Sequence, residues 1–205
     1  ETLNNDDVLG LNYNRVKTGI YAVNVGVIKR GHWGSDFGFK AMFEGIDIED
    51  TPNRYISGFN DDFYKRRFFG GLQAQYQYKS FDNVLNPTRG MVFLLNVGGK
   101  TEFKETNNTY GYVDSELGFF NALSKNKKLV LKTDVRSQFR FGDNLIFYQA
   151  ANIGGNNGLR GYRTERFTGK NALTGSADIR YSFPSFKTSV LPLQLGVFGG
   201  ADIGR

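Results

Sequence analysis

The clearest structural signal in the sequence is residues 68–79, FFGGLQAQYQYK, in which two kinds of residue alternate. The even positions from Phe68 to Tyr78 are apolar, aromatic or glycine, and the odd positions from Gln73 to Lys79 are polar. Successive side chains of a β-strand point to opposite faces of a sheet. The alternation therefore predicts a strand with one apolar and one polar face.

The same alternation recurs along the whole chain. It is sharp in residues 128–141 and 173–183 and weaker in 19–28, 35–47 and 90–101. Residues 111–120 and 191–203 are the remaining two ranges of the set. These ranges amount to about eight strands, and no stretch combines helical spacing with helix caps. Most of them run to about ten residues or more, whereas strands of soluble sheets usually have about five or six. The longer length suits tilted transmembrane strands.

The connections between these ranges also alternate in length. Residues 29–34, 80–89, 121–127 and 184–190 are short, whereas 48–67, 102–110 and 142–172 are long and polar. Short turns on one side and long loops on the other are typical of outer-membrane barrels. Aromatic residues near the strand ends are predicted to form the girdles at the two membrane interfaces, namely Tyr21, Phe37, Phe68, Tyr78, Tyr110, Tyr112, Phe139, Phe141, Tyr181 and Phe183.

The composition of the 205 residues argues against most kinds of catalytic site. There is no cysteine and only one histidine, His32, which excludes disulfides and thiol chemistry and leaves little for a metal site or a Ser-His-Asp triad. No carboxylate pair has a spacing that calls for acid–base chemistry. The net charge of +6 is spread over turns and loops, which predicts a solvated surface and no nucleic-acid partner. We therefore expect no catalytic residue, no metal and no cofactor.

Hydropathy and alternation leave two architectures open. The mean hydropathy is −0.42, and no apolar run approaches the roughly 20 residues of a membrane helix. A barrel explains the low value because half of each strand faces a polar lumen. The polar row from Lys132 to Arg140 favours such a lumen. However, a soluble β-sandwich or a lipocalin-like barrel also alternates, with its apolar face turned inward.

Four short segments resemble a known family. Residues 81–90 (FDNVLNPTRG) resemble the strand-turn-strand signature of the outer-membrane assembly factor superfamily, the bacterial surface antigen barrels that include BamA, TamA and FhaC. Residues 159–162 (LRGY) resemble the motif at the tip of the long sixth loop in that family. Residues 177–181 (ADIRY) and 200–204 (GADIG) are similar to the next two strands. The four segments occur in the order of the family, and they carry the motif residues Asp82, Asn86, Pro87, Thr88, Arg89, Gly90, Leu159, Arg160, Gly161 and Tyr162.

The resemblance implies a role for Arg160. In the family the sixth loop folds back into the lumen, and its arginine pairs with acidic residues of the inner wall. Asp178 lies on the predicted polar face with Ser176. Asp202 lies on the face of its strand opposite to that of Val197, so both acids should face the lumen. We expect Arg160 to contact Asp178 or Asp202 and to hold loop 142–172 inside the barrel.

The resemblance also sets the expected extent and function of the chain. The family barrel has about sixteen strands, so residues 1–205 are predicted to be a partial transmembrane barrel from a bacterial outer membrane. Its implied function is non-covalent insertion or translocation of proteins. The expected partners are outer-membrane lipid, a client or fused protein domain, and periplasmic proteins or lipoproteins.

Two alternatives to this function remain. Residues 157–170 resemble Bacteroidota barrels that carry a metallophosphoesterase or patatin-like domain, which would make this barrel an anchor or export device for a hydrolase outside the chain. The other alternative is a soluble β-barrel carrier.

Overall fold

The computed structural model describes residues 16–59, 61–104, 108–187 and 191–205, so the first fifteen residues of the predicted barrel domain lie outside the described part. Eight antiparallel strands form one large sheet in the order β1-β2-β3-β4-β5-β6-β9-β12. These strands are β1 (Lys17–Arg30), β2 (Ser35–Glu49), β3 (Arg67–Phe81), β4 (Gly90–Glu102), β5 (Thr109–Ala122), β6 (Leu129–Phe141), β9 (Asn171–Ser182) and β12 (Gly196–Gly204). The predicted all-β antiparallel architecture is confirmed.

Short elements occupy the connections. The β2–β3 connection contains η1 (Tyr55–Gly58) and α1 (Asp61–Tyr64), and the β6–β9 connection contains η2 (Phe147–Gln149), β7 (Ala151–Ile153) and β8 (Phe167–Gly169). β7 and β8 pair with each other, as do β10 (Phe186–Lys187) and β11 (Pro192–Leu193). Among the described residues, no helix is long and apolar enough to cross a membrane.

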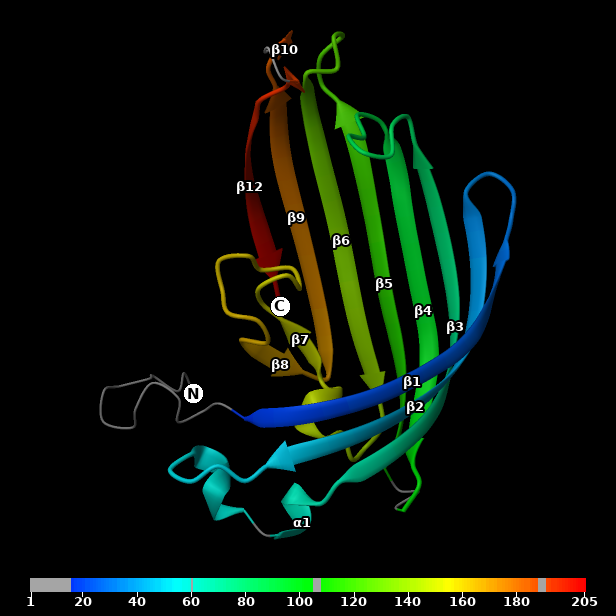
Figure 1. The fold of residues 1–205 in the computed structure, drawn as a ribbon, viewed down its shortest axis with the longest axis vertical. Coiled ribbons are helices and arrows are strands. Elements are labelled where there is room, and N and C mark those ends of the chain that lie inside the picture. The colour runs from blue at the N-terminus through cyan, green and yellow to red at the C-terminus, as the bar shows by residue number, and fades with distance from the viewer. Residues whose placement is uncertain (1–15, 60, 105–107, 188–190) are drawn as a thin grey trace.

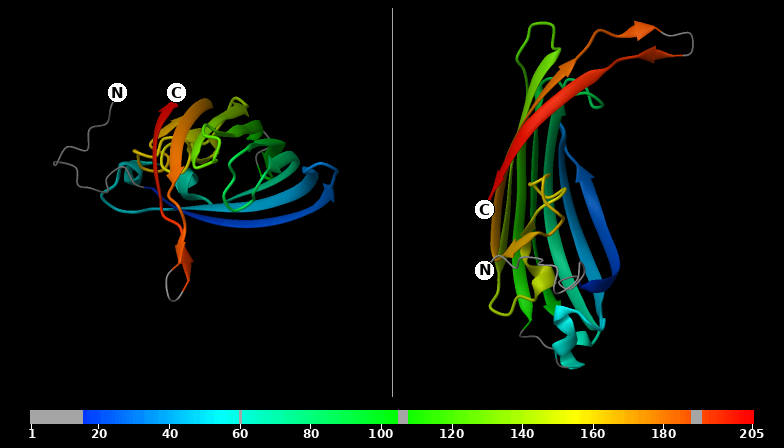
Figure 2. Two further views of the ribbon diagram at one scale, coloured as in Figure 1. Left: turned by 90° about the horizontal axis from the view of Figure 1, so that it is seen from above. Right: turned by 90° about the vertical axis from the view of Figure 1, so that its left-hand side faces the viewer.

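The sheet is strongly curved, and the β6–β9 connection lies inside the curve (Figures 1 and 2). The short turns β1–β2, β3–β4 and β5–β6 lie at one end of the sheet, and the long connections lie at the other (Figure 1). A small apolar cluster of Ala151, Ile153 and Ala172, with Leu159 packed against it, joins the inner connection to the sheet.

The convex face of the sheet is apolar and the concave face is polar. On β2, Phe37, Phe39 and Phe43 are exposed on the convex side, whereas Lys40 and Glu44, which have the other parity, are half-buried on the concave side. The register continues this pattern from strand to strand. Each outward-facing residue lies directly opposite an outward-facing residue of the next strand, as Phe37 of β2 lies opposite Tyr76 of β3. The structure therefore presents one face suited to lipid and one suited to water.

The sequence-based prediction was wrong in two places. Residues 191–203 are not one strand. β12 begins only at Gly196, because residues 192–193 form β11 and pair with β10 instead of β9. Tyr110 and Tyr112 do not belong to an interface girdle. They lie buried on the concave side of β5, where the Tyr112 hydroxyl donates to Gln73 Oε1 at 2.7 Å.

Candidate functional site

The register of β9 and β12 brings two acidic residues together on the concave face. Asp202 of β12 lies directly opposite Ser176 of β9, and Asp178 is two residues further along β9. Residues in this diagonal relation on one face are close enough for side chains to share a partner. The two carboxylates thus form a pair of acceptors that faces the inner connection.

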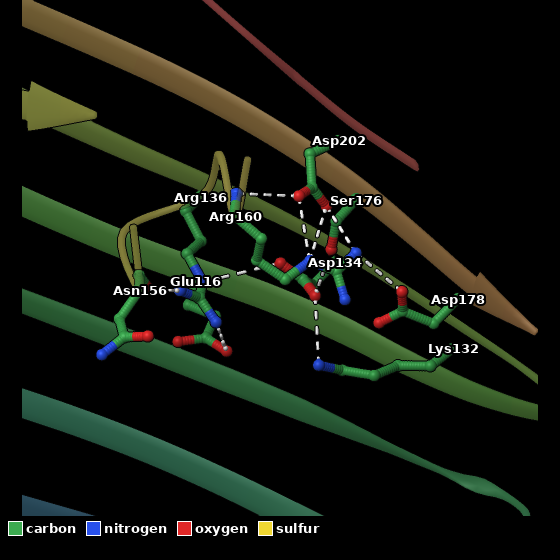
Figure 3. A network of polar contacts seen from close by, with 9 residues as sticks. All are labelled: Glu116, Lys132, Asp134, Arg136, Asn156, Arg160, Ser176, Asp178 and Asp202. Carbon is green, nitrogen blue, oxygen red and sulfur yellow. Dashed lines mark hydrogen bonds and ion pairs between the residues drawn. The ribbon is translucent and has the colours of Figure 1, made fainter. Parts of the chain in front are cut away.

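Arg160 fills this pair of acceptors, as Figure 3 shows. Its Nε donates to Asp202 Oδ2 at 2.9 Å and its Nη2 donates to Asp202 Oδ1 at 2.6 Å, which is a bidentate contact. Nη2 also donates to Asp178 Oδ1 at 2.7 Å. The backbone N–H of Arg160 donates to Asp202 Oδ2 at 3.0 Å. We call these three residues the Arg160 clamp.

The clamp lies at the boundary between the connection and the sheet. The side chains of Asp178 and Asp202 are 16% and 11% exposed, whereas that of Arg160 is 45% exposed. The hydrogen bond to Asp202, and to a smaller extent the one to Asp178, raises the pKa of the Arg160 guanidinium further above its usual value. Arg160 therefore stays charged. The carboxylates are largely shielded from water, so solvent screens this contact less than a surface ion pair.

Two glycines allow the connection to approach the sheet closely. Gly158 has a φ of +96°, and a Cβ there would lie 2.5 Å from the Thr174 side chain. At Gly200, a Cβ would lie 1.9 Å from Asp178 Oδ1 and 3.0 Å from Arg160 Nη2. Any larger residue at either position would occupy the space that the contact needs.

A wider polar network continues from the clamp along β6 and β5 (Figure 3). Ser176 Oγ donates to Asp134 Oδ1 at 2.7 Å, and Asp134 also lies 3.3 Å from Lys132 Nζ and 3.5 Å from Arg136 Nε. Arg136 Nη2 lies 3.5 Å from Glu116 Oε1, and Arg136 Nη1 donates to the Asn156 carbonyl of the connection at 3.2 Å. The network pairs nearly every charge on this part of the concave face.

A second attachment of the connection was not predicted from the sequence. Gln138 Nε2 donates to the Asn152 carbonyl at 3.1 Å, while its Oε1 accepts from the Asn152 backbone N–H at 3.2 Å. Arg140 Nε donates to the Gln149 carbonyl at 3.1 Å, and its Nη1 lies 2.5 Å from Asp114 Oδ1. The polar row on β6 was the available signal, but alternation does not reveal which segment a polar face will bind.

The other members of the loop motif shape the loop and make no clamp contact. Leu159 packs on the apolar cluster, and its carbonyl accepts from the Tyr162 N–H at 3.2 Å. The Tyr162 ring is half-exposed and lies 5.2 Å from that of Phe167. A Cβ at Gly161 would meet nothing within 4 Å. Arg160 is therefore the motif residue that contacts the acidic pair.

The turn motif at the opposite end of the sheet is organised by Asp82. Asp82 Oδ1 accepts from the backbone N–H groups of Thr88 at 2.8 Å and Arg89 at 3.0 Å, and Oδ2 accepts from Thr88 Oγ1. Asn83 Oδ1 accepts from the N–H groups of Leu85 and Asn86, an Asx turn. Gly90 has a φ of +150°, and a Cβ there would lie 2.1 Å from the Ser80 carbonyl.

The turn motif also contacts distant strands. The Pro87 carbonyl accepts from Arg180 Nη2 of β9 at 2.6 Å, and Asp82 Oδ2 lies 3.2 Å from Lys127 Nζ in the β5–β6 turn. β9 therefore contacts the loop through Asp178 and the turn through Arg180. Both family-like motifs are fixed to the concave face of the same strand.

The turn predicts a specific pH dependence. The Thr88 hydroxyl, the backbone N–H groups of Arg89 and Thr88, and the Lys127 ammonium hold the pKa of Asp82 far below its usual value. A carboxyl whose pKa is lowered by folding stabilises the fold fully above its unfolded pKa of about 3.9, and this contribution is lost as the pH falls through the folded value. Asp82→Asn is therefore expected to lower the thermal midpoint of the barrel at neutral pH, and the deficit should shrink in acid.

Heat-modifiable gel mobility of the full-length protein, measured across pH, checks this expectation. Asp143→Asn, at an exposed loop carboxylate, is the matched control and should leave the midpoint unchanged. A deficit for Asp82→Asn that stays constant down to strongly acidic pH would show that the Asp82 charge does not hold the turn.

Among the described residues, no three or more His, Cys, Asp or Glu side chains gather as metal ligands would.

Comparison with known proteins places these features in context. The sequence matches the family model of the Omp85 superfamily domain over residues 4–203. The fold is similar to the crystal structure of BamA from Haemophilus ducreyi lacking POTRA domains 1-3, with a TM-score of 0.67 and 16% sequence identity. The similarity covers 91% of this chain and 42% of the BamA chain, so this chain spans less than half of that structure. No curated protein matches the sequence.

Proposed function

The chain belongs to the Omp85 superfamily, and from this premise we propose that the protein inserts or translocates other proteins at the outer membrane by a non-covalent mechanism. Membership confirms the resemblance seen in the sequence motifs and indicates that the barrel resides in the bacterial outer membrane. Its fold is similar to part of the BamA structure.

The Arg160 clamp is the observation that carries this proposal. It fixes the inner connection across the polar face by contacts to two strands, Asp178 on β9 and Asp202 on β12. A connection held there occupies part of the interior that a passive diffusion pore would leave open. It also stiffens the β9–β12 wall, because one guanidinium bridges both strands. A client would then be handled at the strand edges and in the surrounding lipid, with no covalent step.

The apolar convex face has the height expected of an outer-membrane barrel. Ring contacts mark two aromatic levels, one at Phe43 and Phe68 and the other at Phe37 and Tyr76. On β3 the outward aromatic residues run from Phe68 to Tyr78, ten residues, which is about 33 Å along the strand and about 25 Å along the membrane normal at a tilt of about 40°. Outer-membrane barrels usually have an apolar band of about 25 Å. The convex face therefore matches the apolar band of a barrel that spans the outer membrane.

Reconstitution tests the proposed activity. The full-length protein is placed in vesicles of outer-membrane phospholipids and offered an unfolded small barrel as client, whose folding is read as heat-modifiable mobility. We expect folding to be several-fold faster than in empty vesicles, and Arg160→Ala to lose most of this gain although the protein still inserts. Equal folding rates with and without the protein would contradict the proposal.

A second candidate function rests on residues 157–170, which resemble barrels linked to a hydrolase domain. In that case the barrel anchors or exports one attached enzyme. Depletion of the protein in cells separates the two functions. A general loss of outer-membrane proteins supports assembly, whereas loss of a single hydrolase from the cell surface supports anchoring.

A further inference from the structure

The three short turns at one end of the sheet carry a surplus of basic residues. We call residues 29–36, 79–91 and 123–129, which include the adjoining strand ends, the short-turn rim. The rim holds two acidic residues, Asp36 and Asp82, and its basic residues are Lys29, Arg30, Lys79, Arg89, Lys125, Lys127 and Lys128. The family-level function gives these cations no role.

The rim cations are largely unpaired, in contrast to the cations at the strand ends on the other side of the sheet. Within the described part of the chain, Lys127 is the only rim cation with an ion pair, which it makes with Asp82. At the long-loop end, Lys17 pairs with Glu49, Arg66 with Asp47 and Arg67 with Glu102. The strand ends on the long-loop side thus carry balanced charge, whereas the rim has seven basic residues and two acidic ones.

This rim borders the level at which lipid headgroups must lie. Lys29 shares the outward parity of Val25 and Val27 on β1 and is in direct register with Phe37, whose ring lies 4.8 Å from that of Tyr76. Aromatic rings at the end of an apolar face mark the membrane interface. Lysine and arginine at that level can extend their charged ends toward phosphates while their alkyl chains stay with the apolar surface.

Trp33 lies at the tip of the β1–β2 turn, beside these cations. It is 90% exposed, with a φ of +63°, and Gly34 next to it has a φ of +80°. The Gly34 carbonyl accepts from the Lys79 N–H at 2.9 Å, which ties the turn to β3. An indole held in the open beside unpaired cations is suited to the boundary between acyl chains and headgroups.

We propose that the short-turn rim binds the anionic headgroups of phosphodiester lipids, of the phosphatidylglycerol type, in the leaflet next to it. The cations lie on three turns along the edge that borders the lipid-facing rings of Phe37 and Tyr76. At that level lipid headgroups are the anions present at high local concentration, and many small mobile headgroups can neutralise cations distributed along an edge. The proposal uses the membrane placement of the barrel and is independent of its insertion activity.

Quenching of Trp33 by brominated lipid tests the proposal. The full-length protein and its Trp33→Phe variant are reconstituted with phosphatidylcholine and an equal share of brominated phosphatidylglycerol or brominated phosphatidylcholine. The Trp33 signal is the difference between the two proteins. We expect stronger quenching by the anionic lipid and a preference that weakens at high salt. The triple substitution K29Q/R30Q/K125Q is expected to reduce the preference by at least about fivefold.

The matched control is R163Q/R166Q/K170Q, which removes three cations from the exposed long connection and should leave the preference unchanged. Lipid retained on the purified proteins, measured by mass spectrometry, provides a second readout that does not depend on Trp33. Equal quenching by both lipids, or a rim triple that keeps the preference, would overturn the proposal. The proposal would also be overturned if the K29Q/R30Q/K125Q protein lost an acidic protein partner but retained as much lipid as the unsubstituted protein. Heat-modifiable mobility shows whether each variant has inserted into the bilayer. A loss of lipid preference can therefore be distinguished from a loss of client folding activity.

Discussion

Arg160→Ala is expected to release the inner connection from the concave face. The substitution removes the bidentate contact to Asp202 and the contact to Asp178, and it leaves two shielded carboxylates without their cation. Charge-assisted hydrogen bonds of this kind contribute about 1.5–3 kcal/mol each. Because Arg160 is partly exposed, we discount their combined effect to about 2 kcal/mol, which is roughly a 30-fold rise in the released population.

Hydrogen exchange of the full-length protein in a bilayer measures this release. The amides of Gly154, Gly155, Asn157 and Tyr162 are bonded within the connection, so their exchange should accelerate while that of β5 stays constant. Arg160→Lys keeps the charge but loses the planar fork and should give an intermediate rate. Arg163→Ala, at a neighbouring exposed arginine outside the clamp, is the control. Unchanged exchange in Arg160→Ala would show that other contacts hold the connection.

Gly200→Ala is expected to weaken the same clamp without removing any charge. The added methyl would lie 1.9 Å from Asp178 Oδ1 and 2.8 Å from the Ala177 carbonyl, so the Asp178 side chain must move away from Arg160. Strain of this kind typically costs about 1–3 kcal/mol. We therefore expect exchange in the connection to accelerate about tenfold or more, in the same amides that Arg160→Ala affects.

Gly199→Ala is a close control for this experiment. Gly199 is the neighbouring residue of β12, and a Cβ there meets nothing within 4 Å. It should leave exchange in the connection unchanged. In the double variant, Gly200→Ala should add little to Arg160→Ala, since both act on one contact. Fully additive effects would mean that Gly200 matters for the backbone of β12 and not for the clamp.

The strands were predictable from the sequence because alternation is a local property. Residues 68–79 and 128–141 each lie mostly within one strand of the large sheet, and 128–141 ends where β6 ends. The polar parity of Asp178 was also visible, since it follows from neighbours one and two residues away. The break before β12 was missed because alternation continued through Leu191 and Leu193, whereas the pairing of residues 192–193 with β10 is not a local property.

The contacts between segments could not be read in this way. The attachment of Asn152 to Gln138, and that of the Pro87 carbonyl to Arg180, join residues whose proximity depends on the path of a long connection or turn. Tyr110 and Tyr112 were assigned to an interface because aromatic residues near strand ends favour that position. Their parity on β5 instead turns them inward, onto Gln73 and its neighbours.

An antiparallel sheet of long strands with one apolar and one polar face, and the positions of its turns, could be predicted from local sequence, whereas the arginine and acidic residues of the clamp were implied by the family resemblance. These follow from periodicity, from turn residues such as Gly90 and from short motifs, all of which act within a few residues. The tertiary structure was needed to show that Arg160 bridges β9 and β12, and that β9 contacts both the inner connection and the β3–β4 turn. Those contacts depend on the curvature of the sheet and on register between strands distant in sequence, which no local pattern specifies.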